Sequence, residues 1–438
     1  MNSSDNNGAT RRQFLGASAA TAMATATGLS ASALAVGPGR VWGNADKIKI
    51  GLVGCGGRGT GAAAQALHAD PGVVLVSIGD VLKSAIDRSV VNLKAETQIG
   101  DRVQVTQDNM FVGLDAYKKV IDSGVDVVLL TTPPGFRPLH IKYAVEANKH
   151  VFAEKPMGTD TAGVHMALES VKLAKQKKLN FVAGFCWRYD YPRREFFRRL
   201  HDGAIGDIRH IHATYLTSPV KPMPAPESRP TGMSDTEWQI RNWYNFTYLS
   251  GDGLVEQACH SVDKILWTMK DVPPLRCVAT GSRLLPNNEG NIYDHIDVFY
   301  EWADGTRATM AQRQIPCQYN DNSDYVAGAK GHGYIKGPAP TIQTTSLWKY
   351  SGPDKNMYQV EHDEMYAAIR KGTVINDGER MWRSTLAGLM GRMAAYTGQE
   401  ITWEQMLASR ERLVPENMDW NSPLAIAPMA VAGKTPFV

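Results

Sequence analysis

The sequence contains little that would suit a disulfide-stapled, nucleic-acid-binding or membrane-spanning protein. Its five cysteines are scattered and odd in number, which favours neither a disulfide framework nor a zinc site. The net charge is only +3 over 438 residues, and no basic run is interleaved with aromatic residues, so no nucleic-acid partner is expected. The length instead allows two domains of ordinary size with real apolar cores. These absences favour a protein that works on small molecules.

Residues 1–44 differ from the rest and are typical of a secretory signal followed by a linker. The stretch TRRQFLG begins at Thr10, and an uncharged region rich in Ala, Thr and Ser follows as far as Val36. Two adjacent arginines before x-Phe-Leu are typical of the twin-arginine signal, by which folded proteins are exported. A short amphipathic or membrane-anchoring helix is the alternative, but Thr, Ser and Gly dilute its hydrophobicity.

We therefore expect the twin-arginine export machinery as a partner and a periplasmic or otherwise exported location. Cleavage after Ala35 and retention of the signal as an anchor both stay open.

Residues 45–185 alternate between strand and helix patterns, as a doubly wound parallel sheet does. Apolar runs predict strands at 47–54, 73–80, 125–132, 150–154 and 180–185, with a weaker one at 102–106. Helical patterns fall at 61–69, after Val81, and at 115–124, 140–148 and 164–178. The pattern predicts an α/β domain of the Rossmann type.

The segment GCGGRG lies between the first strand and the first helix and contains the pattern Gly54-x-Gly56-x-x-Gly59. About twenty residues later, Asp80 ends the second strand. Glycines let the backbone approach a pyrophosphate at the helix N-terminus, and the aspartate would accept hydrogen bonds from the ribose hydroxyls. NAD is therefore favoured over NADP, which Lys83 keeps as the lesser option. A plain strand-to-helix turn is the alternative interpretation.

Three further groups follow later strands, at the edge of the sheet where such folds bind ligands. They are Thr132-Pro133, Glu154-Lys155-Pro156 and Trp187-Arg188-Tyr189. For the first group, a turn enforced by prolines is as good an interpretation as cofactor contact. The proline after Lys155 restricts that lysine to extended backbone, which keeps it at the carboxyl end of its strand.

The second half shows long alternating strands without intervening helices at 207–216, 276–284 and 294–314. This change marks a domain boundary near residue 186, so that 186–438 form a second domain. A proline-rich segment at 219–235 is interpreted as a surface loop or arm.

Taken together, the motifs resemble the Gfo/Idh/MocA oxidoreductases, which include glucose-fructose oxidoreductase and inositol dehydrogenase. The resemblance rests on GLVGCGGRG, on TTPP followed by His140, on AEKPMG, on GFCWRYDYPRREFFRRLHDGAIGDIRHI, on GDGLVEQACHSVDKILW and on the run from Asp363 to Gln399. It implies an N-terminal nucleotide domain and a C-terminal α/β domain with an open, mostly antiparallel sheet that covers the nicotinamide.

The resemblance also implies a set of contacts. Because arms in relatives mediate oligomer contacts, we expect a homo-oligomer, with a disordered loop as the alternative interpretation of 219–235. The residues expected to contact a tightly bound NAD are Gly54, Gly56, Gly57, Arg58, Gly59, Asp80, Thr132, Pro133, His140, Glu154, Lys155, Trp187 and Arg188.

By the same resemblance, Lys155 and His260 meet over the nicotinamide ring, with Glu256 where the family has aspartate. If 254–267 is one helix, Glu256 and His260 share a face, and the carboxylate would fix the imidazole tautomer and make it more basic. His260 would remove a hydroxyl proton, while Lys155 would supply charge to the developing alkoxide or share the proton transfer. A core-packed His260 is the alternative. A metal site with Asp263 is set aside, because no further ligand pair has metal-like spacing.

The stretch RNWYNFTYLSGDG, just before that helix, is the best prediction for substrate contact. Aromatic faces hold the C–H groups of sugars and polar donors hold their hydroxyls, although we expect about half of these aromatics to pack in the core. The candidates from this stretch are Arg241, Trp243, Tyr244 and Tyr248, to which His260 is added, with Asp294 and His295 as weaker ones.

The resulting hypothesis is an exported NAD-dependent oxidoreductase acting on a hydroxyl or keto group of a sugar, glycoside or cyclitol. The alternative is an NAD-dependent glycosidase, a branch of the family that oxidises a hydroxyl transiently with no net redox change. The EKP lysine tends to be replaced in that branch, so the retained Lys155 favours the dehydrogenase. A dinucleotide-sensing regulator is the third class, which export and the retention of His260 argue against.

Overall fold

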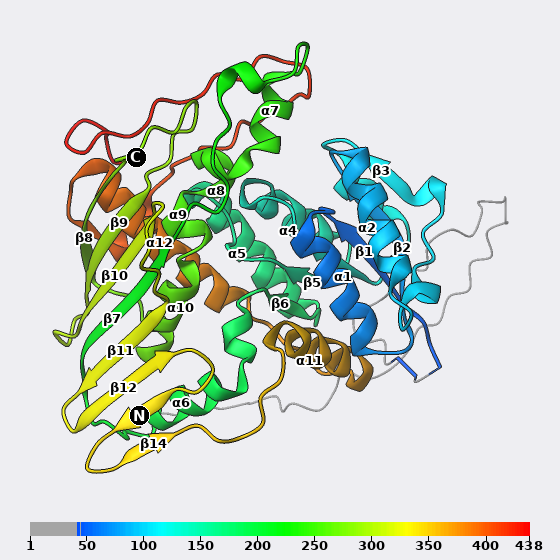
Figure 1. Ribbon diagram of the computed structural model, residues 1–438. Coiled ribbons are helices and arrows are strands. Elements are labelled where there is room, and N and C mark those ends of the chain that lie inside the picture. Colours follow the sequence, from blue (N-terminus) through cyan, green and yellow to red (C-terminus); the bar gives the residue numbers. More distant parts are fainter. Residues whose placement is uncertain (1–41, 44) are drawn as a thin grey trace, which may run out of the picture. The chain divides into compact units, whose positions relative to one another are not determined.

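Two sheets carry the fold, and the first is a doubly wound parallel sheet (Figure 1). The computed structural model describes residues 42–43 and 45–438, so the predicted export signal lies outside the described residues. The strand order is β3-β2-β1-β4-β5-β6, and every neighbouring pair is parallel. The strands are β1 (Ile48–Val53), β2 (Val73–Asp80), β3 (Met110–Val112), β4 (Val127–Leu130), β5 (His150–Ala153) and β6 (Phe181–Ala183). The predicted Rossmann-type sheet is confirmed.

Helices connect these strands, as the alternating sequence pattern predicts. They are α1 (Gly57–Ala69), α2 (Lys83–Ala95), α3 (Ala116–Asp122), α4 (Arg137–Glu146) and α5 (Thr161–Gln176). The strands between them are buried over almost their whole length, because helices cover both faces of the sheet.

The strand predicted at 102–106 is wrong. The chain touches the sheet there only through one isolated bridge, Leu75 with Val103, and the edge strand β3 forms later. A short 3₁₀ turn precedes the bridge, and the guanidinium of Arg102 at its end donates to the carbonyls of Leu67 and Asp70. These bonds hold the backbone against the end of α1 instead of along β2.

The second sheet has nine strands in the order β14-β13-β12-β11-β7-β10-β9-β8-β15. Only β7 and β10 are parallel neighbours, so the sheet is mostly antiparallel, as expected. The strands are β7 (Ile208–Thr217), β8 (Arg276–Ser282), β9 (His295–Glu301), β10 (Arg307–Gln314), β11 (Ser323–Gly328), β12 (Gly331–Lys336), β13 (Thr341–Gln343), β14 (Leu347–Lys349) and β15 (Ile401–Thr402).

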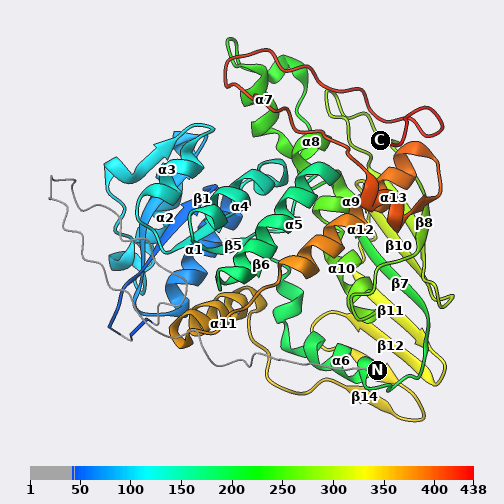
Figure 2. The same ribbon diagram turned by 180° about the vertical axis from the view of Figure 1, so that it is seen from behind.

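Helices cover one face of this sheet (Figure 2). The other face exposes large apolar side chains. Val278, Phe299 and Tyr325 are among those exposed residues. The expected homo-oligomer stays a prediction, for which this face offers a surface. The helices of the second part are α6 (Tyr191–His201), α7 (Asp235–Arg241), α8 (Thr247–Ser250), α9 (Gly253–Glu256), α10 (Cys259–Thr268), α11 (Met357–Lys371), α12 (Gly378–Thr397) and α13 (Trp403–Ala408).

Helix α12 joins the two sheets into one core. It is buried almost throughout and packs against α5 on one side and against β8 and β9 on the other. One apolar cluster therefore runs from Val128 and Val151 in the first sheet to Val298 and Met310 in the second. The described residues accordingly belong to a single compact unit. The division at residue 186 stays a prediction.

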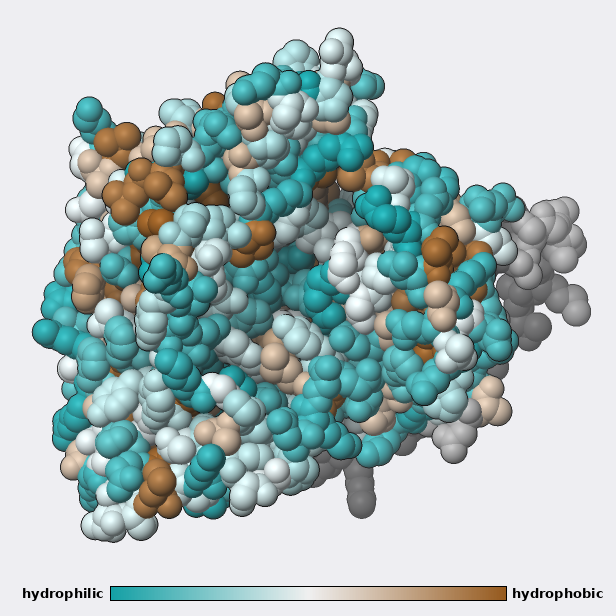
Figure 3. Space-filling model, in the orientation of Figure 1, coloured by the Kyte–Doolittle hydropathy of each residue, from teal (hydrophilic) through white to brown (hydrophobic). Residues whose placement is uncertain are grey.

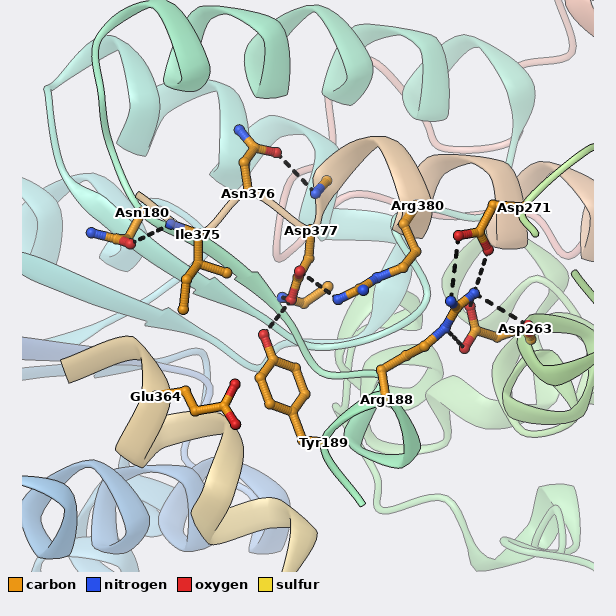
Figure 4. Close-up of polar contacts among 12 residues, drawn as sticks. Asn180, Arg188, Tyr189, Asp263, Asp271, Glu364, Ile375, Asn376, Asp377 and Arg380 are labelled. Carbon is orange, nitrogen blue, oxygen red and sulfur yellow. Dashed lines mark hydrogen bonds and ion pairs between the residues drawn. The ribbon is translucent and has the colours of Figure 1, made fainter. Parts of the chain in front are cut away.

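The end of the first sheet is tied to the second part by buried polar contacts (Figure 4). The Tyr189 hydroxyl donates to Asp377 Oδ2 at 2.6 Å, at the start of α12. The Arg188 guanidinium, 3% exposed, forms a forked pair with Asp263 at 2.8 and 2.9 Å and also reaches Asp271 at 2.5 Å. Arg188 was expected at the cofactor. Instead, its donors are used in holding α10 to the turn after β6.

No helix among the described residues is both long and apolar enough to cross a membrane. Within the same residues, no group of three or more His, Cys, Asp and Glu side chains is arranged to hold a metal ion. All five cysteines are free, and Cys317 alone among them is exposed.

Replacing Arg188 by Met should lower the free energy of unfolding by about 3–5 kcal/mol, because Asp263 would stay buried without its cation. Urea denaturation measures this. Arg198→Met is the matched control, since Arg198 pairs with Glu195 in solvent and its loss should change stability little. Equal effects of the two substitutions would contradict a stabilising role for the Arg188 pair.

Candidate active site

A cavity of about 720 Å³ lies where the carboxyl ends of β1, β2, β4 and β5 meet α9, α10 and β7. Its size is within the range of pockets that hold cofactors and small ligands. The space-filling view shows a hollow on this face of the molecule (Figure 3). The cavity lies at the sheet edge at which parallel α/β sheets bind nucleotides.

The glycine loop forms one wall of the cavity, and the space around each glycine explains why no side chain is present there. Gly54 has φ +96°, and a Cβ there would stand 2.7 Å from the backbone nitrogen of Thr132. A Cβ on Gly59 would stand 1.9 Å from the Gly54 carbonyl oxygen, so the close approach of α1 to the loop requires glycine. At Gly56 and Gly57 a Cβ would meet nothing within 4 Å and would instead project into the cavity.

The start of α1 is therefore an open cradle for an anion. Gly56 caps the helix without any side-chain hydrogen bond, so the first backbone N–H groups are available. Asp80 stands beside the loop, where its Oδ2 accepts the Cys55 N–H at 2.7 Å and its Oδ1 accepts the Leu82 N–H at 2.9 Å. Burial raises the pKa of Asp80. Its carboxylate lines the cavity and retains lone pairs for ribose hydroxyls.

The Arg58 side chain is held by two carboxylates. Its guanidinium bonds to Glu154 and to Glu361 on α11, the latter at 3.0 Å. Glu154 and Arg58 still line the cavity, as expected for cofactor residues, but their charges largely neutralise each other.

Lys155 points across the cavity to the second part of the chain. Its Nζ donates to the Glu256 carbonyl oxygen at 2.6 Å and to Glu256 Oε1 at 3.0 Å. Burial alone would lower the pKa of Lys155, but the carboxylates of Glu256 and Glu154 more than offset this and raise the pKa. Lys155 is therefore held as an ammonium ion.

His260 lines the same cavity but is not paired with Glu256. The predicted helix over 254–267 is broken into α9 and α10, because the Ala258 N–H bonds five residues back to the Gly253 carbonyl and widens the turn. Both Glu256 oxygens are used elsewhere, one by Lys155 and one by Gln257 Nε2 at 2.7 Å. The expectation that Glu256 orients His260 and makes it more basic is wrong in this structure.

The His260 ring lies between Trp187 and Phe185, with ring centroids at 5.0 and 5.8 Å. Its Nδ1 is buried and has no partner. Burial, reinforced by the charges of Lys155, Lys264, Arg193 and Arg58, lowers the pKa of His260 well below its ordinary value. The imidazole is thus neutral at physiological pH.

The other predicted residues divide into two groups. Those that line the cavity include Thr132, Pro133, His140, Trp187, Arg241 and Trp243. Tyr244 is buried beside it, and its hydroxyl accepts the Gln314 amide at 2.5 Å, so it packs in the core. Tyr248, Asp294 and His295 are not among the lining residues, and the Asp294 carboxylate bonds instead to the backbone of Leu284 and Leu285.

Sequence reasoning missed two lining residues that extend the Lys155–Glu256 pair. The Tyr215 hydroxyl donates to Gln257 Oε1 at 2.9 Å, and Gln257 in turn donates to Glu256. Tyr215 lies on β7, where the strand pattern gave a fold assignment but no reason to assign a site. The one sequence feature that could have indicated a site here is an aromatic residue with a hydroxyl, at a half-buried strand position next to the proline-rich arm.

It also missed Arg137, which is 2% exposed and positions two turns of the cavity wall. Its Nη1 donates to the Pro156 carbonyl and its Nη2 to the Thr132 carbonyl, each at 2.5 Å. Burial lowers the pKa of Arg137 to about 10, so it remains a cation that fixes the turns after β4 and β5 against each other.

Two family models match the chain, one in each half. The model of the oxidoreductase family with an NAD-binding Rossmann fold matches residues 48–185, and the model of the GFO/IDH/MocA C-terminal domain matches residues 194–332.

Three similar proteins illustrate the range of the family. Inositol 2-dehydrogenase of Rhizobium meliloti (strain 1021) is 22% identical over 347 residues, which are 76% of this chain and 92% of that protein. A glycosyl hydrolase family 109 protein of Shewanella sp. (strain W3-18-1) is 24% identical over 297 residues, 66% of this chain and 56% of that protein. Aldose-aldose oxidoreductase from Caulobacter crescentus has the same fold, with a TM-score of 0.64 at 17% identity, over 81% of this chain and 99% of that one. Both domain models, together with the glycine loop and the cavity beside it, show that the chain belongs to the Gfo/Idh/MocA family of oxidoreductases.

Proposed function

We propose that this chain is an exported oxidoreductase that transfers hydride between a bound NAD and a hydroxyl or keto carbon of a sugar, glycoside or cyclitol. The observation that carries the proposal is that Lys155 and His260, from distant parts of the chain, line one cavity with the glycine loop. A fixed cation, a neutral imidazole and a dinucleotide loop are the parts that such a reaction needs. The name of the inositol 2-dehydrogenase relative supports the substrate class.

The residues present fit a nicotinamide dinucleotide, which when bound accepts or returns the hydride. The uncapped start of α1 and the open space at Gly56 and Gly57 would receive its pyrophosphate. Asp80 would hold the ribose hydroxyls and repel a 2′-phosphate, which favours NAD. Lys83 pairs with Asp87 and does not line the cavity, so it would not contact a 2′-phosphate. Arg88 does line the cavity, so the preference for NAD rests on Asp80.

The charges of the site assign separate roles to its two candidate catalytic residues. The ammonium of Lys155 would stabilise the oxygen of the substrate as negative charge develops there. The neutral imidazole of His260 would take the hydroxyl proton in oxidation and return it in reduction. Of the two roles expected for Lys155, the raised pKa favours the electrostatic one over proton transfer.

An NAD-dependent glycosidase is the second candidate, favoured by the likeness to the family 109 protein. Such an enzyme would use the same hydride transfer transiently and release an aglycone without net redox change. The retained Lys155 supports the dehydrogenase.

Lys155→Ala should abolish turnover while leaving NAD bound, because the alkoxide would lose its counter-charge in a buried site. The assay incubates the protein with a panel of polyols, sugars and aryl glycosides, following nicotinamide absorbance and aglycone release separately. Absorbance change alone supports the dehydrogenase, and aglycone release without it supports the glycosidase. Lys142→Ala is the control, since Lys142 pairs with Glu146 on the surface of α4. Unchanged turnover in the Lys155 variant would refute the assigned site.

The pH profile of kcat/KM should be broad. Because the pKa of His260 is lowered, the acid limb should lie below its ordinary value of about 6.5. Because the pKa of Lys155 is raised, loss of its proton should occur only above about 10.4. In Glu256→Gln the main counter-charge is gone and burial dominates, so the basic limb should move toward neutral pH. A wild-type acid limb near pH 7, or an unmoved basic limb in the variant, would contradict this.

The export proposal rests on the TRRQFLG motif and on the need to hold a cofactor where nicotinamide is scarce. Cell fractionation should find the full chain in the periplasm with NAD bound, identified by chromatography of the nucleotide released on denaturation. Replacing Arg11 and Arg12 by Lys should leave the protein in the cytoplasm. Periplasmic protein without nucleotide would contradict the tight binding, and released NADP would contradict the preference for NAD.

A further inference from the structure

One segment of the second part reaches over to the nucleotide-binding part. Residues 218–246, here called the clasp, lie between β7 and α8 and include α7 and two short 3₁₀ turns. Four of its side chains, Met223, Trp238, Ile240 and Phe246, form a separate apolar cluster together with Leu249. The proline-rich stretch lies mostly at the surface, as expected of a surface loop or arm, and is anchored in this cluster by Met223.

The clasp packs on residues of the first part that lie near the expected ribose site. Val81, Leu114 and Phe136 all contact its apolar cluster. Val81 directly follows Asp80 at the end of β2, and Leu114 follows the edge strand β3. All three also line the cavity. The clasp therefore covers the end of the cavity that β2 and β3 form, which is the adenosine end of a Rossmann site.

The clasp also supplies its own side chains to the cavity. These are Val220, Lys221, Ile240, Arg241 and Trp243. The aliphatic and aromatic side chains suit the faces of an adenine ring, whereas the Arg241 guanidinium is paired with Glu237 and the Lys221 ammonium donates to the Arg241 carbonyl oxygen. At the catalytic end, by contrast, the His260 ring is bounded by Trp187 and Phe185, which follow β6.

The C-terminal tail holds the clasp in place. Figures 1 and 2 both show the tail running along α7. Met418, Trp420 and Ile426 pack against the apolar cluster of the clasp. The Asp419 carbonyl accepts the Thr236 hydroxyl at 2.7 Å, the Leu424 carbonyl accepts the Gln239 amide at 2.7 Å, and the Leu424 N–H donates to Asp235 at 3.0 Å. Both ends of α7 are therefore tied to chain that is remote in sequence.

We propose that the clasp is a second wall of the adenosine site, contributed by the C-terminal part, with Trp243 contacting the cofactor. Trp243 was expected at the substrate, but it packs against the same apolar cluster as Val81 and Leu114, which line the other end of the cavity. The inference rests on the proposed function, since it assumes a bound dinucleotide. The clasp and the first part then enclose the adenosine end of the cofactor between them, so loosening the clasp should speed release of the cofactor.

The test uses two fragments of the cofactor, ADP-ribose and nicotinamide mononucleotide, titrated against the full chain freed of nucleotide. Trp243→Ala should weaken ADP-ribose binding roughly tenfold or more and leave nicotinamide mononucleotide binding unchanged. Trp348→Ala is the matched control, because Trp348 lies on β14 under Arg199, away from the cavity, and should change neither. Trp420→Ala, in the tail, should speed the release of NADH, measured by fluorescence, without removing any cavity side chain.

Unchanged ADP-ribose affinity in Trp243→Ala would overturn the inference, as would weakening of nicotinamide mononucleotide alone. A wild-type chain that binds no ADP-ribose would overturn the inference and the proposed function together. If ADP-ribose binding weakens as expected while Lys155→Ala keeps full turnover, the clasp stands and the proposed catalytic site fails. Thermal unfolding of each variant separates a lost contact from a lost fold, and Trp420→Ala tests the clasp again if Trp243→Ala does not fold.

Discussion

The ion pair between Lys155 and Glu256 is the interaction on which the site depends. It joins the end of β5 to the end of α9, 101 residues apart in the chain, with both side chains about nine-tenths buried. A buried pair of this kind adds little net stability, because desolvation offsets the attraction. Its effect is geometric: it fixes the lysine as a cation at one position and brings the two parts of the chain into a common wall.

The neighbours of the pair have their arrangement because of it. Glu256 is turned to Lys155 and Gln257 and makes no hydrogen bond to His260, whose imidazole is kept neutral by burial and by the surrounding cations. The Gln257 amide donates to the second carboxylate oxygen of Glu256, and its own oxygen accepts the hydroxyl of Tyr215 on the second sheet. The widened turn before α10 makes this arrangement possible, because it separates two residues that a regular helix would place together.

The sequence predicted the fold well where one periodicity dominated. Buried parallel strands are continuous apolar runs, and their order placed the glycine loop correctly between β1 and α1. It failed at 102–106, where arginine hydrogen bonds to carbonyls outweighed strand propensity. The partners of side chains were also beyond reach. Helical spacing predicted that Glu256 would contact His260, and the family resemblance predicted that Arg188 would contact the cofactor. In the structure each side chain pairs instead with an opposite charge from another element, Glu256 with Lys155 and Arg188 with Asp263. The structural role of Arg137 could not be predicted from the sequence, because its partners are backbone carbonyls, which every residue has.

A late segment of the chain, α11, completes the core of the first sheet, and this affects the order in which the protein can fold during synthesis. Helix α11 packs on α1, and Val360, Met365, Tyr366 and Ile369 fill the same core as β1 and β2. A nascent chain therefore cannot finish its nucleotide-binding half until more than four-fifths of it has left the ribosome. The loop that would hold the cofactor is built early, but the support behind it arrives late. A chain that ended before α11 would therefore lack a complete first core.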